Sequence, residues 1–214
     1  VRDSLNHQLP RAVGAEIGSI SSIAKRLIIT TALWRMEMEN ELAYIGDAGT
    51  TVDKGPSRRL GIDFSARLQL TKWLFCDLDL NLANNIFVYD IYGSKLEQDY
   101  YIPLAPRFTS AGGMTANIGK SIITSLRYRQ LSERPANESN TVVTRPYTVL
   151  DLTMNYTYKK IKLGLIIENL LDIEWNEAQF NTESRLFDEP DSVEEIHFTP
   201  GTPFSARMTV GYLF

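Results

Sequence analysis

The feature of this sequence that most restricts its fold is a strict alternation of apolar and polar side chains. In the segment RRLGIDFSARLQL every second residue from Leu60 to Leu70 is apolar, and the residues between them are mostly polar or charged. Successive side chains of a β-strand point to opposite faces, so this segment is predicted to be a strand with one apolar face. Helical periodicity is nearly absent from the chain.

The same pattern recurs along the sequence and predicts about nine strands. We expect them at about 12–22, 27–43, 58–70, 74–84, 106–119, 122–133, 147–158, 161–168 and 204–214. Several run to ten residues or more, whereas strands of globular sheets usually have five or six. A strand of that greater length can cross a bilayer at a tilt.

The connections between these segments alternate between short and long. Tight turns are expected near Lys25–Arg26, Thr71–Trp73, Gly119–Ser121 and Lys159–Lys160. Long polar connections, rich in Gly, Pro, Asn and acidic residues, are expected at about 44–57, 89–105, 134–146 and 172–201. This rhythm is typical of an outer-membrane barrel, which has short periplasmic turns and long extracellular loops.

Composition excludes several classes of protein. The 214 residues carry 22 Lys and Arg against 26 Asp and Glu, a net charge of -4, which argues against a nucleic-acid partner. The single cysteine, Cys76, cannot form an internal disulfide or a CxxC site, and the presence of only two histidines argues against a multi-histidine metal site. We therefore expect no metal and no cofactor. Since the chain begins at Val1 rather than Met, it is interpreted as a piece of a longer protein.

Alternation alone leaves open what each face meets. A soluble β-sandwich buries its apolar face, whereas a membrane barrel turns that face to lipid and its polar face to the lumen. Charged residues are assigned to the polar face at Glu16, Arg35, Glu37, Asp63, Arg67, Asp77, Asp79, Arg127, Asp151, Lys162 and Arg207.

Aromatic residues gather at the ends of the expected strands. Those at the short-turn end are Trp73, Tyr158, Tyr212 and Phe214; those at the long-loop end are Tyr44, Phe87, Tyr89, Tyr147 and Phe204. Two such belts are typical of a membrane barrel, because amphipathic rings favour the headgroup zone. The alternative is that these rings cap an ordinary core.

Four motifs, in order, resemble the C-terminal barrel portion of TonB-dependent outer-membrane receptors. They are RRLGIDF, YIPLAPRFTSAGG, IIENLLDIEW and FTPGTPFSARMTVGYLF. The resemblance implies an all-β fold: an antiparallel transmembrane β-barrel of about 22 strands, of which residues 1–214 supply the C-terminal portion. The plug domain and TonB box of the family do not occur in the sequence.

The resemblance also implies a location, a function and partners. It implies a receptor in the bacterial outer membrane that takes up a scarce small-molecule nutrient, such as a ferric siderophore, haem, cobalamin or a glycan. The TonB complex would supply energy through the plug. Outer-membrane lipid, lipopolysaccharide and the barrel-assembly machinery are further expected partners. Tyr212 and Phe214 match the terminal aromatic signal that this machinery reads.

Candidate ligand-binding residues lie in the long connections. Trp175, Phe180, Phe187 and Phe198 are in the longest one, where aromatics could anchor a ligand or could pack the loop onto the barrel rim. Arg107, Arg129 and Arg134, with Arg127, are expected near the mouth. They could attract an anionic nutrient or bind lipopolysaccharide phosphates.

No motif indicates catalysis. Asp77 and Asp79 share a face and could form an acid–base pair, but solvated lumen charges are the favoured interpretation. The acidic loop that ends at His197 could bind a hard cation or simply be solvated. Asn169 and Asp172 are expected to bond backbone groups where a strand bends into a loop.

The chain is therefore predicted not to be an enzyme. Two alternatives stay open: a soluble secreted β-sandwich that binds glycan or protein, and an outer-membrane enzyme using His7 or His197 as its base.

Overall fold

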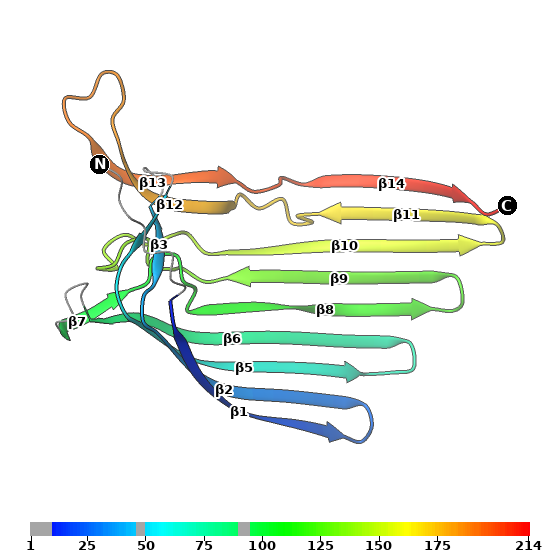
Figure 1. Ribbon diagram of the computed structural model, residues 1–214. Coiled ribbons are helices and arrows are strands. Elements are labelled where there is room, and N and C mark those ends of the chain that lie inside the picture. Colours follow the sequence, from blue (N-terminus) through cyan, green and yellow to red (C-terminus); the bar gives the residue numbers. More distant parts are fainter. Residues whose placement is uncertain (1–9, 46–49, 90–94) are drawn as a thin grey trace.

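The computed structural model describes residues 10–45, 50–89 and 95–214, and it is built from β-strands (Figure 1). Its main sheet is antiparallel. The strand order is β1 (Ala12–Ile23), β2 (Leu27–Met38), β5 (Ser57–Gln69), β6 (Leu74–Tyr89), β8 (Phe108–Ile118), β9 (Ile122–Leu131), β10 (Tyr147–Tyr158), β11 (Ile161–Glu168) and β14 (Ser205–Tyr212). Each of the nine predicted strands has a counterpart among these nine, and the described part of the chain contains five further strands. The short strand β7 (Lys95–Tyr101) pairs with β6 off this path.

The strand register joins the apolar positions into one continuous face. One row across four strands is Leu33, Ile62, Leu82 and Phe108, and a row further along consists of Leu126, Leu152 and Ile167. A one-residue slip of any strand would move its apolar set to the opposite face, so the alternation itself specifies this register.

The prediction for Arg35 and Glu37 is wrong. Arg35 pairs with Leu60, and Glu37 pairs with Arg58, so both lie on the apolar face, at its long-loop end. Parity explains the error: Arg35 is two residues from Leu33, which belongs to the apolar face. The other charged residues assigned to the polar face keep the parity expected of them.

All four tight turns lie together at one end of the sheet, and the long connections lie at the other (Figure 1). Three of the turns contain a left-handed backbone conformation: φ is 56° at Lys25, 63° at Gly119 and 53° at Lys159. Left-handed residues match the twist of tight hairpins, which lets neighbouring strands stay paired up to the turn.

The long connections contain additional strands. One hairpin consists of β3 (Leu42–Ile45) and β4 (Thr50–Asp53), and a second consists of β12 (Asn176–Ser184) and β13 (Val193–Pro200). The strand expected at 27–43 is therefore two strands. Strand β2 ends at Met38, and β3 begins at Leu42. Between them lies Glu41, whose buried carboxylate accepts hydrogen bonds from Ser57 Oγ and Arg59 Nη2, each at 2.6 Å.

The buried core lies at the long-loop end. Its apolar members are Phe87, Ile102, Ala136, Val149 and Trp175. By contrast, the aromatics expected at the short-turn end are exposed there, as the prediction requires: Trp73, Tyr158, Tyr212 and Phe214.

The belt expected at the long-loop end is only partly present. Phe87 is buried, and Tyr147 shares the polar face with Arg129; only Phe204 is an exposed ring. The side chains of Tyr44 and Tyr89 lie outside the described residues. Phe87 differs from Leu82 by an odd number of positions, so within one long strand it must face the other way.

The sheet has two open edges in the described part of the chain. There β1 pairs only with β2, and β14 pairs only with β11. Within the described ranges, no helix is long and apolar enough to cross a membrane.

Candidate functional site

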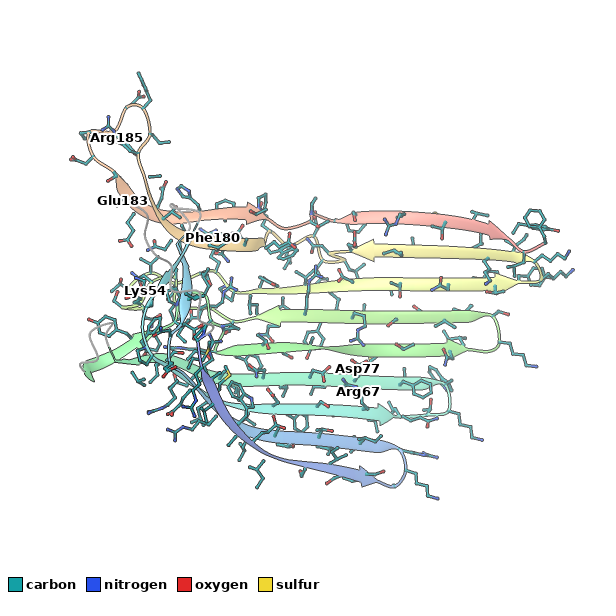
Figure 2. All side chains as sticks on the ribbon, in the orientation of Figure 1. Lys54, Arg67, Asp77, Phe180, Glu183 and Arg185 are labelled. Carbon is teal, nitrogen blue, oxygen red and sulfur yellow. The ribbon has the colours of Figure 1, made fainter. Side chains whose placement is uncertain are left out.

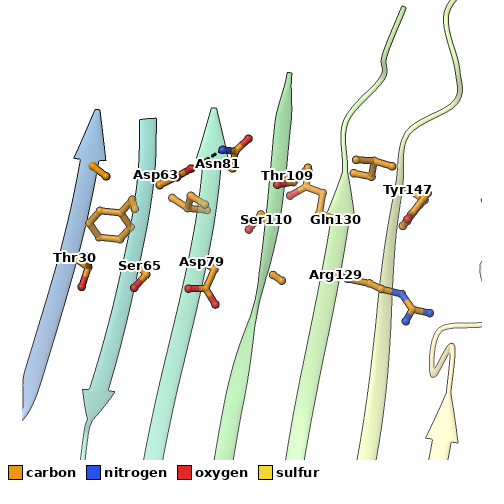
Figure 3. Close-up of a pocket in the computed structure, with 15 residues that line it drawn as sticks. Thr30, Asp63, Ser65, Asp79, Asn81, Thr109, Ser110, Arg129, Gln130 and Tyr147 are labelled. Atoms are coloured by element: carbon orange, nitrogen blue, oxygen red, sulfur yellow. Dashed lines mark hydrogen bonds between the residues drawn. The ribbon is translucent and has the colours of Figure 1, made fainter. Parts of the chain in front are cut away.

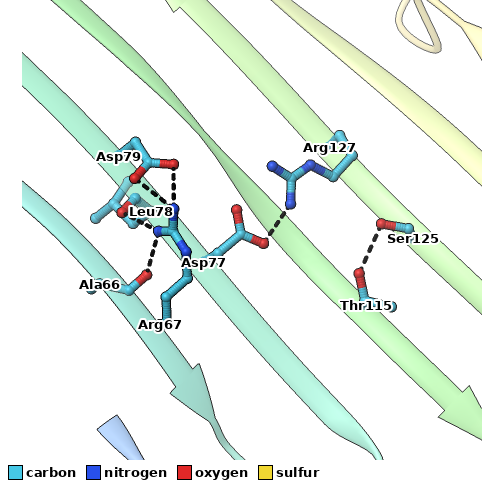
Figure 4. A network of polar contacts seen from close by, with 8 residues as sticks. All are labelled: Ala66, Arg67, Asp77, Leu78, Asp79, Thr115, Ser125 and Arg127. Atoms are coloured by element: carbon cyan, nitrogen blue, oxygen red, sulfur yellow. Dashed lines mark hydrogen bonds and ion pairs between the residues drawn. The ribbon is translucent and has the colours of Figure 1, made fainter. Parts of the chain in front are cut away.

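The polar face carries a band of ion pairs across β5, β6 and β9 (Figure 4). Arg67 donates two hydrogen bonds to the Asp79 carboxylate, at 2.8 and 2.9 Å. Asp77 is bonded instead to Arg127, which reaches it across the intervening strand β8. Each aspartate has its own arginine, so the two do not converge on one point as an acid–base pair would.

Gly113 permits the longer of these contacts. It pairs with Asp77 on one side and with Arg127 on the other. A Cβ at this position would lie 3.0 Å from Arg127 Cδ and 2.2 Å from the Leu126 carbonyl oxygen. A side chain at 113 would therefore occupy the path of the arginine.

A hollow of about 490 Å³ lies on the polar face between this band and the long loops (Figure 3). Residues of six neighbouring strands line it, which indicates that the sheet curves toward its polar face. The side chains that line it are mostly polar or charged: Thr30, Asp63, Ser65, Asp79, Asn81, Thr109, Arg129 and Tyr147. Ser110 and Gln130 border it with their backbone, because the register places them in the row of Phe64 and Leu80 on the apolar face. Hydroxyls, amides and carboxylates around one arginine can hydrogen-bond a polar, oxygen-rich ligand.

At one side of the hollow, Arg129, Tyr147 and Trp175 form a cluster that we term the aromatic clamp. The Arg129 guanidinium carbon lies 5.1 Å from the centre of the Trp175 ring, and the Tyr147 and Trp175 rings are 4.8 Å apart. The Asp151 carboxylate is 3.9 Å from Arg129. The clamp thus presents a half-exposed cation held in place by aromatic rings.

Buried polar side chains attach the β12–β13 hairpin to the sheet. Gln179 donates to the Arg145 carbonyl and accepts from the Arg145 amide, at 3.0 and 2.9 Å. Asn169 bonds Ile173 and the Thr202 carbonyl, and Trp175 Nε1 donates to the same carbonyl at 3.0 Å. These contacts confirm the predicted bend at Asn169. Asp172 also bonds a backbone group, as predicted: its carboxylate accepts a hydrogen bond from the Phe204 amide at 3.1 Å.

A second cavity, of about 870 Å³, lies at the base of this hairpin. Arg145, Trp175 and Phe198 line it, together with backbone from both ends of the hairpin. Trp175 contacts Arg129 and Tyr147, which line the first hollow, so the aromatic clamp connects the linings of the two cavities.

The structure separates the four predicted loop aromatics. Trp175 is buried in the clamp, and Phe198 lines the cavity beside it. Phe180 lies on β12, well away from the ion pairs of the main sheet (Figure 2). Phe187 is fully exposed near the hairpin tip, so it does not pack onto the rim.

The three predicted arginines are also dispersed. Arg129 belongs to the clamp. Arg134 lies in the connection after β9, where its backbone amide donates to Thr144 Oγ1 at 3.2 Å. Burial lowers the pKa of the Arg134 guanidinium, and Tyr147 partly opposes that effect. Arg107 stacks over Tyr101 beside residues of the apolar face.

Two further predictions can be placed. Tyr212 and Phe214 make an edge-to-face contact at 5.4 Å at the short-turn end of β14. His197 lies 3.1 Å from Ser184 Oγ and 3.2 Å from Glu195 on the exposed hairpin, whereas His7 lies outside the described residues. Among the described residues, no group of three or more His, Cys, Asp or Glu could hold a metal ion.

The sequence model of the TonB-dependent receptor-like β-barrel matches residues 11–170. This is most of the chain, and it covers the strands that carry the ion pairs and the hollow. The chain belongs to the TonB-dependent receptor family. A comparison with curated proteins found no match.

Solved receptors have the same fold. The siderophore receptor PiuA from Acinetobacter baumannii aligns with a TM-score of 0.69 at 18% identity, covering 94% of this chain and 28% of that protein. The ferric yersiniabactin uptake receptor FyuA from Yersinia pestis gives 0.68 at 13% identity, with 96% and 30% covered. The copper transporter OprC gives 0.67 at 17% identity, with 95% and 31% covered. The chain spans less than a third of each.

Family membership settles the open alternatives. The chain is part of an outer-membrane β-barrel, not a soluble β-sandwich, and the family is one of transporters rather than enzymes. The apolar face therefore meets lipid, and the polar face with its hollow and aromatic clamp lines the lumen.

Sequence reasoning missed most of the hollow. Thr30, Ser65 and Asn81 were not candidates, because each is an ordinary polar residue on a strand. Parity assigns all three to the polar face. What brings them to one hollow is the register and curvature across several strands, and no local motif encodes these.

Proposed function

We propose that the chain forms part of the wall and mouth of a receptor that takes up a scarce, oxygen-rich nutrient with energy from the TonB complex. The observation that carries the proposal is the polar hollow in the lumen wall, which ends at the aromatic clamp. A metal chelate with carboxylate or phenolate oxygens matches these donors and the Arg129 cation.

The structural neighbours support this class of nutrient. Two of them bear names that state an iron carrier, a siderophore and ferric yersiniabactin, and the third is a copper transporter. A chelated transition metal is common to the three descriptions. We therefore place a ferric siderophore first and a copper complex second.

Uptake by cells that express the full-length receptor tests the proposal. Cells with and without a working TonB complex would be given a panel of radiolabelled ferric siderophores, haem and copper. We expect accumulation of one class of metal complex, and we expect it to be lost without TonB. Uptake that is unaffected by loss of TonB would contradict energised transport.

The aromatic clamp gives a test of the binding site. Arg129→Gln removes the cation and is expected to weaken binding of the transported complex by about tenfold, the value of one charge-assisted hydrogen bond. Lys162→Gln is the matched control, because Lys162 lies on the same face near the short-turn end. Equal losses in the two variants would show that overall lumen charge matters rather than the clamp.

A further inference from the structure

Gly201, in the connection between β13 and β14, lies against the indole ring of Trp175 (Figure 1). A Cβ at position 201 would be 2.1, 2.3 and 2.5 Å from the ring atoms Cε2, Cδ2 and Cζ2. These distances are far below van der Waals contact. Since Gly201 does not have a positive φ, the position requires glycine for space rather than for backbone conformation.

The same connection holds Trp175 by two hydrogen bonds. The Gly201 amide donates to the Trp175 carbonyl at 2.8 Å, and Trp175 Nε1 donates to the Thr202 carbonyl at 3.0 Å. The backbone and the side chain of Trp175 are thus bonded to two consecutive residues. The ring cannot move away from Gly201 without lengthening one of these bonds, so the connection fixes its orientation.

Trp175 in turn supports Arg129. The guanidinium carbon lies 5.1 Å from the centre of the ring, within the range of a cation–π contact. Arg129 Nη1 lies 3.9 Å from the Asp151 carboxylate, which is too long for an ordinary hydrogen bond. Because half of the Arg129 side chain is exposed, its direction depends mainly on these two neighbours.

Asn169 connects the second of these neighbours to the same connection. Its backbone amide donates to Asp151 Oδ1 at 2.9 Å, and its Nδ2 donates to the Thr202 carbonyl at 3.2 Å. The contacts therefore form a closed ring of Arg129, Trp175, Thr202, Asn169 and Asp151. An arginine that is held from two sides loses less conformational entropy when it binds a ligand.

We propose that Gly201 and the Thr202 carbonyl are positioning elements of the nutrient site. They hold the Trp175 ring, and the ring holds the Arg129 guanidinium at the lumen hollow. The entry to β14 thereby takes part in recognition, although neither Gly201 nor Thr202 lines the hollow. The inference rests on the proposed function, which assigns Arg129 to the nutrient.

The chemical reactivity of Arg129 tests the positioning without any nutrient. Gly201→Ala would be made in the full-length receptor, and modification of Arg129 by phenylglyoxal in detergent would be followed by peptide mass spectrometry. The added methyl group should displace the ring and speed modification by about threefold, the value of an exposed cation–π contact. An unchanged rate at Arg129 would overturn the proposal.

Gly211→Ala is the matched control. Gly211 lies on β14, and a Cβ there would be 3.8 Å from its nearest neighbour, Lys162 Cβ, which is ordinary contact. The Arg129 rate should change by less than about 1.5-fold in this variant. An increase equal to that of Gly201→Ala would refute a specific role for Gly201.

A double-mutant cycle connects the positioning to binding. Ferric citrate, a ferric catecholate and ferric yersiniabactin are the probes, and the one that binds most tightly is used. Gly201→Ala should weaken binding by about fivefold in the wild-type background, but by less than about 1.5-fold in Arg129→Gln. Equal losses in both backgrounds would show that Gly201 does not act through Arg129.

Failure of the proposed function gives a different result. If no probe binds, or if Arg129→Gln binds as tightly as the wild type, the nutrient or the role of Arg129 in the proposed function is wrong. The phenylglyoxal rate then still decides whether Gly201 positions Arg129.

Heat-modifiable electrophoretic mobility checks the fold of each variant. If Gly201→Ala does not fold, Trp175→Phe replaces it, because a phenyl ring lacks the N–H group that bonds the Thr202 carbonyl. The Arg129 rate should rise in this variant as well, and an unchanged rate would count against the proposal.

Discussion

The two ends of the same strands are held by different interactions. At the long-loop end, side chains such as Val149, Asn169 and Gln179 are fully buried among protein atoms. At the short-turn end, Ile122, Tyr158 and the turn residues next to them are half or fully exposed. Protein packs against protein at one end, and lipid or water must complete the surroundings at the other.

Charge separates the two ends as well. The four tight turns carry Lys25, Arg26, Lys72, Lys120, Lys159 and Lys160 and no acidic residue. The β12–β13 hairpin, residues 176–200, carries seven acidic residues and one arginine, Arg185. The net charge of -4 conceals this asymmetry. Cations next to exposed rings, as with Lys160 over Tyr212 at 5.8 Å, suit an anionic headgroup layer.

The free-energy cost of a substitution near the short turns should therefore depend only on its depth in the membrane. Near the long loops, the cost should depend on the specific partners of the side chain that is replaced. Four variants of the full-length receptor, ordered from the largest expected effect to the smallest, test this difference between the two ends. Each is measured as the free energy of unfolding by denaturant in lipid vesicles, unless stated otherwise.

The largest effect is expected from a charge at mid-strand on the lipid face. Leu126→Arg places a cation in the row of Leu152 and Ile167 and should destabilise by about 3 kcal/mol, the value for the bilayer midplane. Ile122→Arg, on the same face beside the turn, should cost about 1 kcal/mol or less. Equal costs would mean that the apolar face does not span the hydrocarbon as inferred.

A buried anchor at the long-loop end comes next. Asn169→Ala leaves the amide and the carbonyl of Ile173 without their Asn169 partner and should cost about 2 kcal/mol. Its control is Asn155→Ala, which is exposed near the short-turn end and should change stability by less than about 0.5 kcal/mol. A similar cost in both would remove the distinction between the two ends.

A smaller, salt-dependent effect is expected from the basic turns. Lys72→Gln/Lys120→Gln should destabilise by about 1 kcal/mol in vesicles that contain phosphatidylglycerol at low salt. The difference should vanish in neutral vesicles or at high salt, because the attraction is screened. Persistence of the effect in neutral vesicles would assign these lysines a role within the protein.

The smallest effect on stability is expected from Phe187→Ser at the hairpin tip. The side chain is fully exposed, so the change should stay within about 0.5 kcal/mol. Nutrient binding is the informative measurement here, since a loss of affinity without a loss of stability would make Phe187 a ligand contact. Phe198→Ser, in the cavity beside Trp175, provides the comparison.

Much of the fold could be predicted from local pattern. Alternation specified the strands, and the short–long rhythm of connections specified which ends lie together. The IIENLLDIEW bend was also predictable, because Asn and Asp bond local backbone groups wherever a strand yields to a loop. The site was less accessible: of the residues proposed from sequence, Arg129 and Trp175 meet in the clamp, whereas Phe187 and Arg107 lie elsewhere.

The errors share a cause. Arg35 and Glu37 were assigned by residue type rather than by parity, and they lie on the apolar face, at its long-loop end. Phe87 was assigned to a belt because it is aromatic, but its strand continues to Tyr89 and turns its ring to the polar face. In both cases the length of the strand decides the direction of the side chain.

The strands, their two faces and the family could be recognised from the sequence, because each depends on residues that are near neighbours in the chain. The positions of the lumen hollow and the aromatic clamp depend on the tertiary structure. Arg127 reaches Asp77 across Gly113, and Arg129 meets Trp175, from positions far apart in sequence. Such contacts depend on strand order, register and curvature, which no single segment encodes.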